Sequence, residues 1–309
     1  MARIALIGLI DHDEVLHLDH LPVPGTSAVI TAVSESPGGT TANTAVALAR
    51  LGEKVTLRAL VGDDPEGQAL REGLEREGVD CAMVTVAGGR PTDRSVILLD
   101  IRTGERTILW RKGAMIDRTD KLDVYTLFDH DVVVLDMADE PLRRFLTDLP
   151  AHTRPDVNLL GPITYIVDNA EPDAVDVAFR FDTITGNITQ FLDLMQVQSE
   201  GELIETVQHR MPGTNLRAAV VTLAADGCLW ITRDAHEYVE GFRVEVSDTI
   251  GAGDAHTAGV AYGMARRWAW PETCRFANAV AALSTTGTGA QSALPTLAEV
   301  EMLMGEPAQ

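Results

Sequence analysis

The sequence predicts an α/β protein in which helices cover both faces of a mostly parallel sheet, and a small second β-sheet projects from it. Three observations predict this class. Short uninterrupted apolar runs are typical of strands buried on both faces. Segments with apolar residues at three- and four-residue steps alternate with those runs, and two pairs of β-rich segments interrupt the alternation. The 309 residues suffice for one large domain, which we expect to span residues 1–309.

The main body of the protein is predicted from the order of these segments. Continuous apolar runs predict buried strands at Ile4–Ile7, Val132–Leu135 and Ala218–Leu223. Helical spacing, together with proline and acidic residues near a segment's start, predicts the helices between and after the strands. The predicted helices are Thr41–Leu51, Pro65–Glu77, Pro141–Leu149, Leu203–His209, Phe276–Leu283 and a helix that follows Gly253.

The small sheet is predicted from two segments, at approximately residues 11–34 and 93–112. Each contains a pair of β-rich stretches. The stretches are Val15–Leu18, Ala28–Val33, Ser95–Leu99 and Arg106–Trp110, the last two joined by a turn at Arg102–Glu105. We expect these segments to form a lid that closes over a ligand and excludes water. The alternative is a pair of ordinary surface hairpins.

Composition limits the partners and the compartment of the protein. The formal net charge is −21, from 46 acidic and 25 basic residues, and such a surface repels nucleic acid and anionic membranes. No apolar stretch approaches the ~20 residues of a membrane span, and the first apolar run predicts a strand rather than a signal peptide. The three cysteines, Cys81, Cys228 and Cys274, are expected to be buried free thiols in a cytoplasmic protein.

The strongest chemical signal is a glycine-rich turn, Gly251-Ala252-Gly253, directly before Asp254 and a helical apolar pattern. The first N–H groups of a helix lack intrahelical partners and lie at the positive end of its dipole. Small residues let phosphate approach those groups. A carboxylate beside phosphate costs Coulomb repulsion, so its natural role is that of general base toward a hydroxyl that attacks a phosphoryl group. The alternative is a capped turn without chemistry.

Two further groups of residues are candidates for binding a hydroxylated ligand. Gly38-Gly39-Thr40-Thr41 is a second glycine-rich turn before a helix, and the Asn43 amide near that helix start suits a sugar hydroxyl. The alternative there is a capping turn, with one of the threonines as cap. Asp11 and Asp13 follow the first strand, where ligands of open α/β sheets gather, and suit vicinal hydroxyls. Taken alone, they are more typical of solvated loop acids.

Several other chemistries are excluded because their motifs are missing. None of the three lysines follows a glycine, so the sequence has no phosphate-binding loop of the Gly-Lys-Ser/Thr type. It has no His-Arg-Asp loop of protein kinases. The glycine-rich turn lacks the third glycine of a dinucleotide fingerprint and lies late in the chain, which disfavours a dinucleotide oxidoreductase. The eight histidines are scattered and show no metal-ligand spacing.

Taken together, these motifs resemble the PfkB-type carbohydrate kinases, the ribokinase-like family, over essentially the whole chain. The stretch Asp248–Asp254 is similar to the family's highly specific Asp-Thr-x-Gly-Ala-Gly-Asp signature. Other similar stretches are Gly8…Asp13…Pro24-Gly25, Gly38-Gly39…Asn43, Gly52, Gly62-Asp63-Asp64…Gly67 and Thr222-Leu223…Asp226-Gly227. The resemblance implies a Rossmann-type three-layer sandwich with a mostly parallel central sheet and a β-sheet lid.

The resemblance also implies a role for each matching residue. Asp254 would be the catalytic base, and the N–H groups of Gly251, Ala252 and Gly253 would bind the transferring γ-phosphate of ATP. The residues that would hold the acceptor are Asp11, Asp13, Gly39 and Asn43. The residues that would lie near ATP are Thr222, Gly227, Thr249 and Asn278. Asp248, with the backbone near Gly289–Ser292, is similar to the family's monovalent-cation site.

Some positions depart from the family's pattern. The family's Asn-x-x-Glu, linked to Mg²⁺ and phosphate, matches Asn187-Ile188-Thr189-Gln190, so Asn187 keeps the link to Mg²⁺ while Gln190 alters metal use. Ala224 stands where a glycine is common. His256 stands where a phenylalanine is common, and we expect it to be a packed helix residue.

The sequence thus predicts an ATP- and Mg²⁺-dependent kinase, with K⁺ as a further cation, that phosphorylates a hydroxyl, expected to be primary, on a small sugar. Two alternatives stay open: a nucleoside kinase of the same family, with Trp110 as the base wall, and a non-catalytic sugar-binding or regulatory protein. Arg102, Arg106 and Arg111 favour a phosphorylated or carboxylated sugar if they point into the site; pointing outward, they are solvated charges. Exposed β-edges of the lid favour a homodimer.

Overall fold

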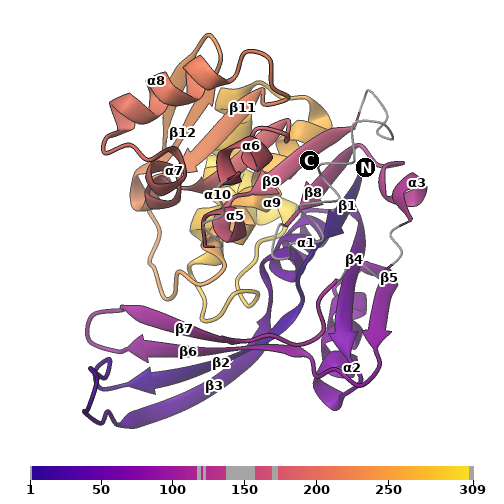
Figure 1. Ribbon diagram of the computed structural model, residues 1–309, viewed down its shortest axis with the longest axis vertical. Helices are drawn as coiled ribbons and strands as arrows, with labels where there is room; N and C mark the ends of the chain where they lie inside the picture. The colour runs from indigo at the N-terminus through magenta and orange to yellow at the C-terminus, as the bar shows by residue number, and fades with distance from the viewer. Residues whose placement is uncertain (1, 117–119, 121–122, 137–156, 169–172, 306–309) are drawn as a thin grey trace.

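The computed structural model describes residues 2–116, 120, 123–136, 157–168 and 173–305, which form a nine-stranded sheet, helices on both of its faces and a four-stranded sheet (Figure 1). The predicted α/β class is confirmed. In spatial order, the strands of the large sheet are β13 (His236–Glu240), β12 (Gly227–Thr232), β11 (Ala218–Thr222), β10 (Thr183–Asn187), β9 (Asn158–Pro162), β8 (Val132–Leu135), β1 (Arg3–Ile7), β4 (Lys54–Gly62) and β5 (Asp80–Ala87). Neighbouring strands are parallel except at β11–β12 and β12–β13.

The helices alternate with the strands, and the predicted ones are found within a few residues of their expected bounds. The helix predicted at Phe276–Leu283 is an exception. It begins earlier, at Trp270, because Trp270 and the proline after it already form the first turn. The predicted helix Pro141–Leu149 lies outside the described residues. The helices are α1 (Thr40–Arg50), α2 (Pro65–Arg76), α3 (Val124–Leu127), α5 (Thr164–Asp168), α6 (Ala174–Ala178), α7 (Ile188–Met195), α8 (Glu200–Arg210), α9 (Ala252–Arg266), α10 (Trp270–Ser284), α11 (Leu297–Met304) and the 3₁₀ turn η2 (Ala224–Asp226).

Continuous apolar runs form the central strands because those strands are buried on both faces. In β1, Ile4 and Leu6 pack into a hydrophobic core that includes residues of α1, α2, α9 and α10. Ala5 and Ile7, which point the other way, pack into a second core with residues of α6, α7 and α8. The two cores join a layer of helices to each face of the sheet. The first core holds α1 and α9 against β1, so that both helices begin near the carboxyl end of that strand.

The predicted small sheet has four strands and projects away from the large sheet at the bottom of Figure 1; we call it the lid, although its closure stays a prediction. In spatial order its strands are β3 (Ile30–Gly38), β2 (Asp11–Leu18), β6 (Asp93–Asp100) and β7 (Arg106–Arg111). The two predicted pairs, β2–β3 and β6–β7, are antiparallel, and β2 and β6 join them as parallel neighbours. The first pair is longer than predicted, because β2 already begins at Asp11 and β3 continues to Gly38. The lid therefore connects directly to β1 and α1.

Three smaller expectations concern membrane spans, cysteines and His256. Within the described ranges, no helix has the length and apolarity that crossing a bilayer requires. The three cysteines are free and buried, as predicted. His256 is 2% exposed within α9, so it is the packed helix residue that we expected. The cytoplasmic location stays a prediction.

Candidate active site

The glycine-rich turn before Asp254 forms the start of α9. Gly251 has a φ of 79°, and a Cβ there would lie 2.8 Å from the carbonyl oxygen of Ala290. No side chain caps the helix. The N–H of Ala252 donates to a carbonyl within the turn (3.3 Å), whereas those of Gly251 and Gly253 have no acceptor among the described residues. These two groups and the helix dipole offer an anion site next to the Asp254 carboxylate.

A chain of amides holds the Asp254 carboxylate in place. Asn43 Nδ2 donates to Asp254 Oδ2 (2.8 Å), and Asn43 Oδ1 accepts from Gln291 Nε2 (2.9 Å). Asn43 is 4% exposed, and both ends of its amide are engaged, so its orientation is fixed. Thr44 Oγ1 approaches the backbone carbonyl of Asp254 (3.3 Å), which ties α1 to α9. The geometry thus gives Asn43, a predicted acceptor ligand, the position of a group that orients Asp254.

The surroundings of Asp254 favour its protonated form. Burial raises the pKa of Asp254 to about 7, and the hydrogen bond from Asn43 opposes that rise. The negative charges of Asp136 and Asp11 raise the pKa further, whereas the Arg106 guanidinium lowers it. A carboxyl group with a pKa near neutrality is suited to accept a proton from a substrate at physiological pH.

Asp11 and Asp13 lie in β2 and are 3% and 7% exposed, so the interpretation as solvated loop acids is wrong. They point to the buried face of the lid, because side chains alternate along a strand and Val15, the next residue on that face, is also buried. Ser95 Oγ of β6 donates to Asp11 Oδ2 (2.7 Å). Burial and the charges of Asp11 and Asp254 raise the pKa of Asp13 above its usual range. Asp13 therefore belongs to the same site as the predicted base.

Three residues of the site were missed by the sequence analysis. Asp136 directly follows β8 and accepts hydrogen bonds from Thr40 and Thr41 at the start of α1. The rule that drew attention to acids after the first strand would also have found Asp136, since β8 is the neighbour of β1. Asp93 and Gln291 have no local signal, because Asp93 enters through strand pairing in the lid and Gln291 through a loop.

The residues predicted near ATP occupy two different environments. Thr222 is the last residue of β11 and Gly227 is the first residue of β12. The two residues flank the turn that contains η2 and joins these neighbouring strands. Thr249 is exposed in the turn before α9. Asn278 is 5% exposed, and its Nδ2 donates to the two carbonyls at the end of β13 (2.9 and 3.1 Å). Its amide therefore braces β13 from α10.

The two predicted cation residues are both held by hydrogen bonds. Asp248 Oδ1 accepts from the Ile250 N–H (2.9 Å) and Oδ2 from the Gly289 N–H (2.8 Å), which joins the turn before α9 to the loop predicted to share the monovalent cation. Asn187 forms a capping box with Gln190 at the start of α7, at 2.9 Å in both directions. In the described part of the chain, no three His, Cys, Asp or Glu side chains are arranged to hold a metal ion.

The lid arginines and Trp110 lie in different environments. Arg102 pairs with a carboxylate of its own hairpin (3.4 Å) and is mostly exposed. Arg106 Nη1 instead lies 3.5 Å from Thr249 Oγ1, so it reaches the turn before α9. The Trp110 ring packs on Tyr165 of α5, with 5.7 Å between ring centroids, and forms an aromatic wall between lid and body. One arginine is thus solvated and one approaches the site.

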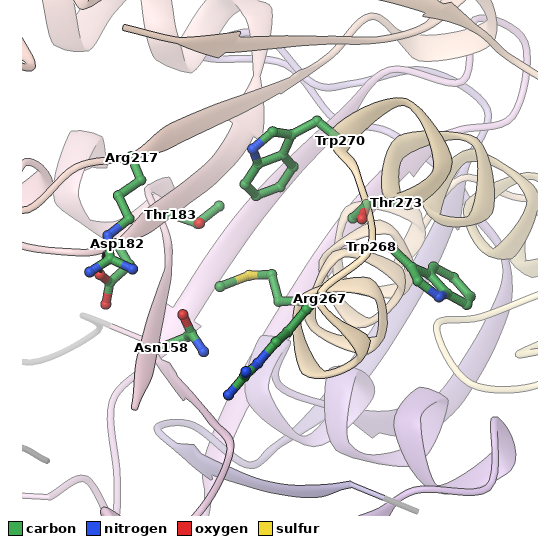
Figure 2. A pocket seen from close by; sticks show the side chains of 9 residues that line it. Asn158, Asp182, Thr183, Arg217, Arg267, Trp268, Trp270 and Thr273 are labelled. Atoms are coloured by element: carbon green, nitrogen blue, oxygen red, sulfur yellow. Dashed lines mark ion pairs between the residues drawn. The ribbon is translucent and has the colours of Figure 1, made fainter. Parts of the chain in front are cut away.

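A separate cavity of about 340 Å³ lies at the opposite edge of the large sheet, where β9, β10 and β11 begin (Figure 2). Its lining residues are Asn158, Asp182, Thr183, Arg217, Met264, Arg267, Trp268, Trp270 and Thr273. The Asp254 carboxylate lies at the other end of α9 from this cavity, because Met264 and Arg267 belong to the carboxyl end of that helix. The cavity is therefore not part of the candidate active site.

Comparison with known proteins agrees with this geometry. Ribokinase of Haemophilus influenzae is 26% identical over 308 residues, which covers 96% of this chain and 96% of that protein. The structure of Arabidopsis thaliana ribokinase with ribose and ATP has a TM-score of 0.83 at 21% identity and 98% coverage of both chains. That of Burkholderia thailandensis nucleoside kinase with inosine has a TM-score of 0.80 at 18% identity, covering 99% of this chain and 100% of the other.

These two structures confirm the predicted ribokinase-like fold of the whole chain. The family assignment comes from the sequence itself. A family model described as "pfkB family carbohydrate kinase" matches residues 1–297. Since the match spans far more than half of the 309 residues, the chain belongs to the pfkB family of carbohydrate kinases.

Proposed function

We propose that this kinase transfers the γ-phosphoryl group of ATP to a hydroxyl, expected to be a primary one, of a small sugar. The observation that carries the proposal is the position of Asp254. Its carboxylate has a pKa near 7 and lies in the first turn of α9, beside N–H groups that lack an acceptor among the described residues. The ribokinase relatives, one of them solved with ribose and ATP, support the same reaction.

In the proposed step, the Asp254 carboxylate accepts the proton of the acceptor hydroxyl while that oxygen forms a bond to the γ-phosphorus. The bond from phosphorus to the bridging oxygen breaks, and its electron pair leaves with ADP. The N–H groups of Gly251 and Gly253 and the α9 dipole stabilise the charge that spreads over the transferring group. Asp254 then releases its proton to solvent.

The proposed reaction also uses two cations, Mg²⁺ and K⁺. Mg²⁺ bound to the phosphates would neutralise part of their charge. Asp248, whose oxygens each keep a lone pair beside the N–H bonds, would hold K⁺ together with nearby carbonyls. The link of Asn187 to Mg²⁺ stays a prediction, as does the nucleotide contact of Thr222, Gly227, Thr249 and Asn278.

The acceptor would lie between Asp254 and the buried face of the lid, near Asp11, Asp13 and the Gly39 turn. Closure of the lid would keep out water, which otherwise competes for the phosphoryl group. A nucleoside is the second candidate acceptor. The Trp110–Tyr165 pair favours it, because the buried Trp110 Nε1 has no partner among the described residues and a base offers both a stacking face and an acceptor.

Homodimer formation through the lid is part of the proposal. β3 and β7 are the two edge strands, and their outer face exposes apolar side chains, with Val33 and Leu109 at 55% and 53%. Both pair in register with partly buried residues of that same face. A second copy would cover these edges, and the mass of the protein in solution tests this.

A coupled ADP-release assay tests the kinase proposal. The acceptors are pentoses, hexoses, keto-sugar acids, sugar phosphates and nucleosides, each with ATP and Mg²⁺ and with or without K⁺. We expect ADP release that depends on one class of acceptor. Silence across the panel, from folded protein that binds ATP, would instead favour the non-catalytic sugar-binding alternative.

Asn43→Ala is expected to shift the acid limb of the kcat/KM pH profile to higher pH and to lower kcat by about 10-fold. The base acts in its ionised form, so wild-type activity should fall as the pH drops below about 7. The Asn43 hydrogen bond lowers the pKa of Asp254, and its loss raises that pKa. Thr44→Val is the control, because the Thr44 hydroxyl bonds the backbone carbonyls of Thr40 and Asp254 and not the Asp254 carboxylate. An acid limb that stays in place in Asn43→Ala would contradict the assignment.

A further inference from the structure

The candidate acceptor site holds more carboxylates than phosphoryl transfer needs. Besides the base they are Asp11, Asp13, Asp93 and Asp136, which are 3%, 7%, 1% and 1% exposed. We refer to these four and Asp254 as the carboxylate cluster. Among the described residues, no Lys, Arg or His lies within the 4.0 Å of an ion pair from any of them. A buried group of like charges is costly unless something positive or protonated accompanies it.

Strand pairing in the lid brings these carboxylates together. Asp11 and Asp93 are register partners on the parallel strands β2 and β6, so their side chains share one face. Asp13 is two residues further along the same face, and a Cβ on Gly38 would overlap carboxylate oxygens of both Asp11 and Asp13. Like charges opposite one another on neighbouring strands destabilise a sheet. The lid therefore carries a local cost at this point.

Three oxygens of the cluster are buried and lack a partner among the described residues: Asp11 Oδ1, Asp93 Oδ2 and Asp136 Oδ1. The other oxygen of each carboxylate is held by protein donors, namely Ser95 for Asp11, the Gly113 N–H for Asp93, and Thr40 and Thr41 for Asp136. Each side chain is thus fixed by one oxygen while the second has no donor. Leaving a buried acceptor unpaired is unfavourable, so these oxygens indicate a ligand that donates hydrogen bonds.

The pKa values show the electrostatic cost of the arrangement. Burial raises the pKa of Asp93 and of Asp136 to about 6. The pKa of Asp13 rises through burial and then through the charges of Asp11 and Asp254. A bound cation would favour the ionised form of every member and remove this cost.

Cations of the chain near the cluster are directed elsewhere. Lys112 Nζ lies over the Trp110 ring (4.6 Å), and Arg106 reaches Thr249. His12 faces Glu35 on the outer side of the lid (3.7 Å). These groups, with Arg111, act on the cluster only at longer range. The described carboxylates also do not gather in threes around one metal position, which favours an extended organic cation over a metal ion.

We propose that the acceptor is a polyhydroxylated amine, such as an amino sugar or amino polyol, whose ammonium group binds to Asp11 and Asp93 of the lid. Its hydroxyls donate to the remaining free oxygens, and one of them gives its proton to Asp254. This inference rests on the proposed kinase function and narrows its substrate class. Keto-sugar acids and sugar phosphates are repelled by the same carboxylates, so they should be poor acceptors.

Matched acceptors test the inference at pH 7, where the amines are largely protonated. One set is D-glucosamine, D-glucose and N-acetyl-D-glucosamine; the other is 1-amino-1-deoxy-D-fructose and D-fructose. We expect at least one amine to exceed its neutral parent by about 10-fold or more in kcat/KM, and in affinity measured by calorimetry, because a charged hydrogen bond is worth more than a neutral one. Acetylation of the amine should abolish the advantage. Equal or better use of the neutral parents in both sets would overturn the inference.

A pair of variants locates the effect. Asp93→Asn keeps an oxygen for the Gly113 N–H and removes one charge of the cluster. Glu14→Gln removes a charge from the outer face of β2, where Glu14 pairs with Arg94 (3.0 Å). We expect Asp93→Asn to lose most of the preference for the amine, measured as the ratio of kcat/KM for the amine to that for its neutral parent, and Glu14→Gln to keep that ratio. An equal loss in both variants would overturn the inference, because the general field of the lid would then set the preference.

Failure of this inference and failure of the kinase proposal give different results. Phosphorylation of neutral sugars without a preference for amines leaves the kinase proposal intact and overturns the inference. Amine binding by calorimetry that depends on Asp93, without ADP release for any acceptor, supports the ammonium-binding site alone and overturns the kinase proposal.

Discussion

Asp254→Asn is expected to lower kcat by a factor on the order of 10²–10⁴ while leaving the fold and the affinity for ATP intact. Asparagine has the same shape as aspartate, so its side-chain oxygen can still accept the hydrogen bond from Asn43 (2.8 Å in the wild type). An amide nevertheless accepts no proton from the acceptor hydroxyl at neutral pH. The loss therefore falls on the chemical step, and single-turnover measurements with saturating ATP and acceptor should show it.

Asp136→Asn is the matched control for the loss of one buried negative charge. Asp136 belongs to the same cluster and raises the pKa of Asp254, yet its carboxylate is held by Thr40 and Thr41 rather than placed at the start of α9. We expect its kcat to stay within about 10-fold of the wild type. Near wild-type turnover in Asp254→Asn would rule out Asp254 as the base.

Local signals in the sequence predicted the glycine-rich turn and the start of α9 well. Gly251-Ala252-Gly253 combines small residues with a helical apolar pattern behind it, and the structure starts α9 at Ala252. The continuous apolar runs likewise predicted β1, β8 and β11, because burial on both faces leaves no polar positions in such strands. In each of these cases the determining interactions lie within a few residues along the chain.

The acidic face of the lid was harder to predict. Asp11 and Asp13 have the composition of a loop, and the beginning of β2 at Asp11 becomes apparent only once β3 and β6 pair with it. A strand normally buries apolar side chains, so a strand that buries aspartates toward a site violates the pattern that identifies strands. Asp93 illustrates the same point, since only its register with Asp11 places it in the cluster. The hydrogen bonds of Asn278 to the end of β13 likewise join segments distant in the sequence, and its place near ATP stays a prediction.

Gly251→Ala is expected to lower kcat by about 10²–10³, the loss seen when one donor of an anion hole is removed. The φ of 79° at this position is unfavourable for a residue with a Cβ, and the Cβ would lie only 2.8 Å from the Ala290 carbonyl oxygen. The turn must therefore shift, and its N–H groups move away from the transferring phosphoryl group. Because the shift acts on charge that develops during transfer, the effect should appear in kcat more than in the KM for the acceptor.

Gly52→Ala separates this positional effect from backbone strain. Gly52 has a φ of 87°, similar to that of Gly251, but nothing lies within 4 Å of a Cβ built there, and it follows the far end of α1. Both variants pay the cost of a non-glycine residue in a left-handed conformation, about 1 kcal/mol of stability. We expect Gly52→Ala to show that loss in its thermal unfolding and to keep its kcat. If Gly251→Ala loses only stability, as Gly52→Ala does, the N–H groups of the turn do not stabilise the transferred phosphoryl group, and that charge must be balanced by other groups.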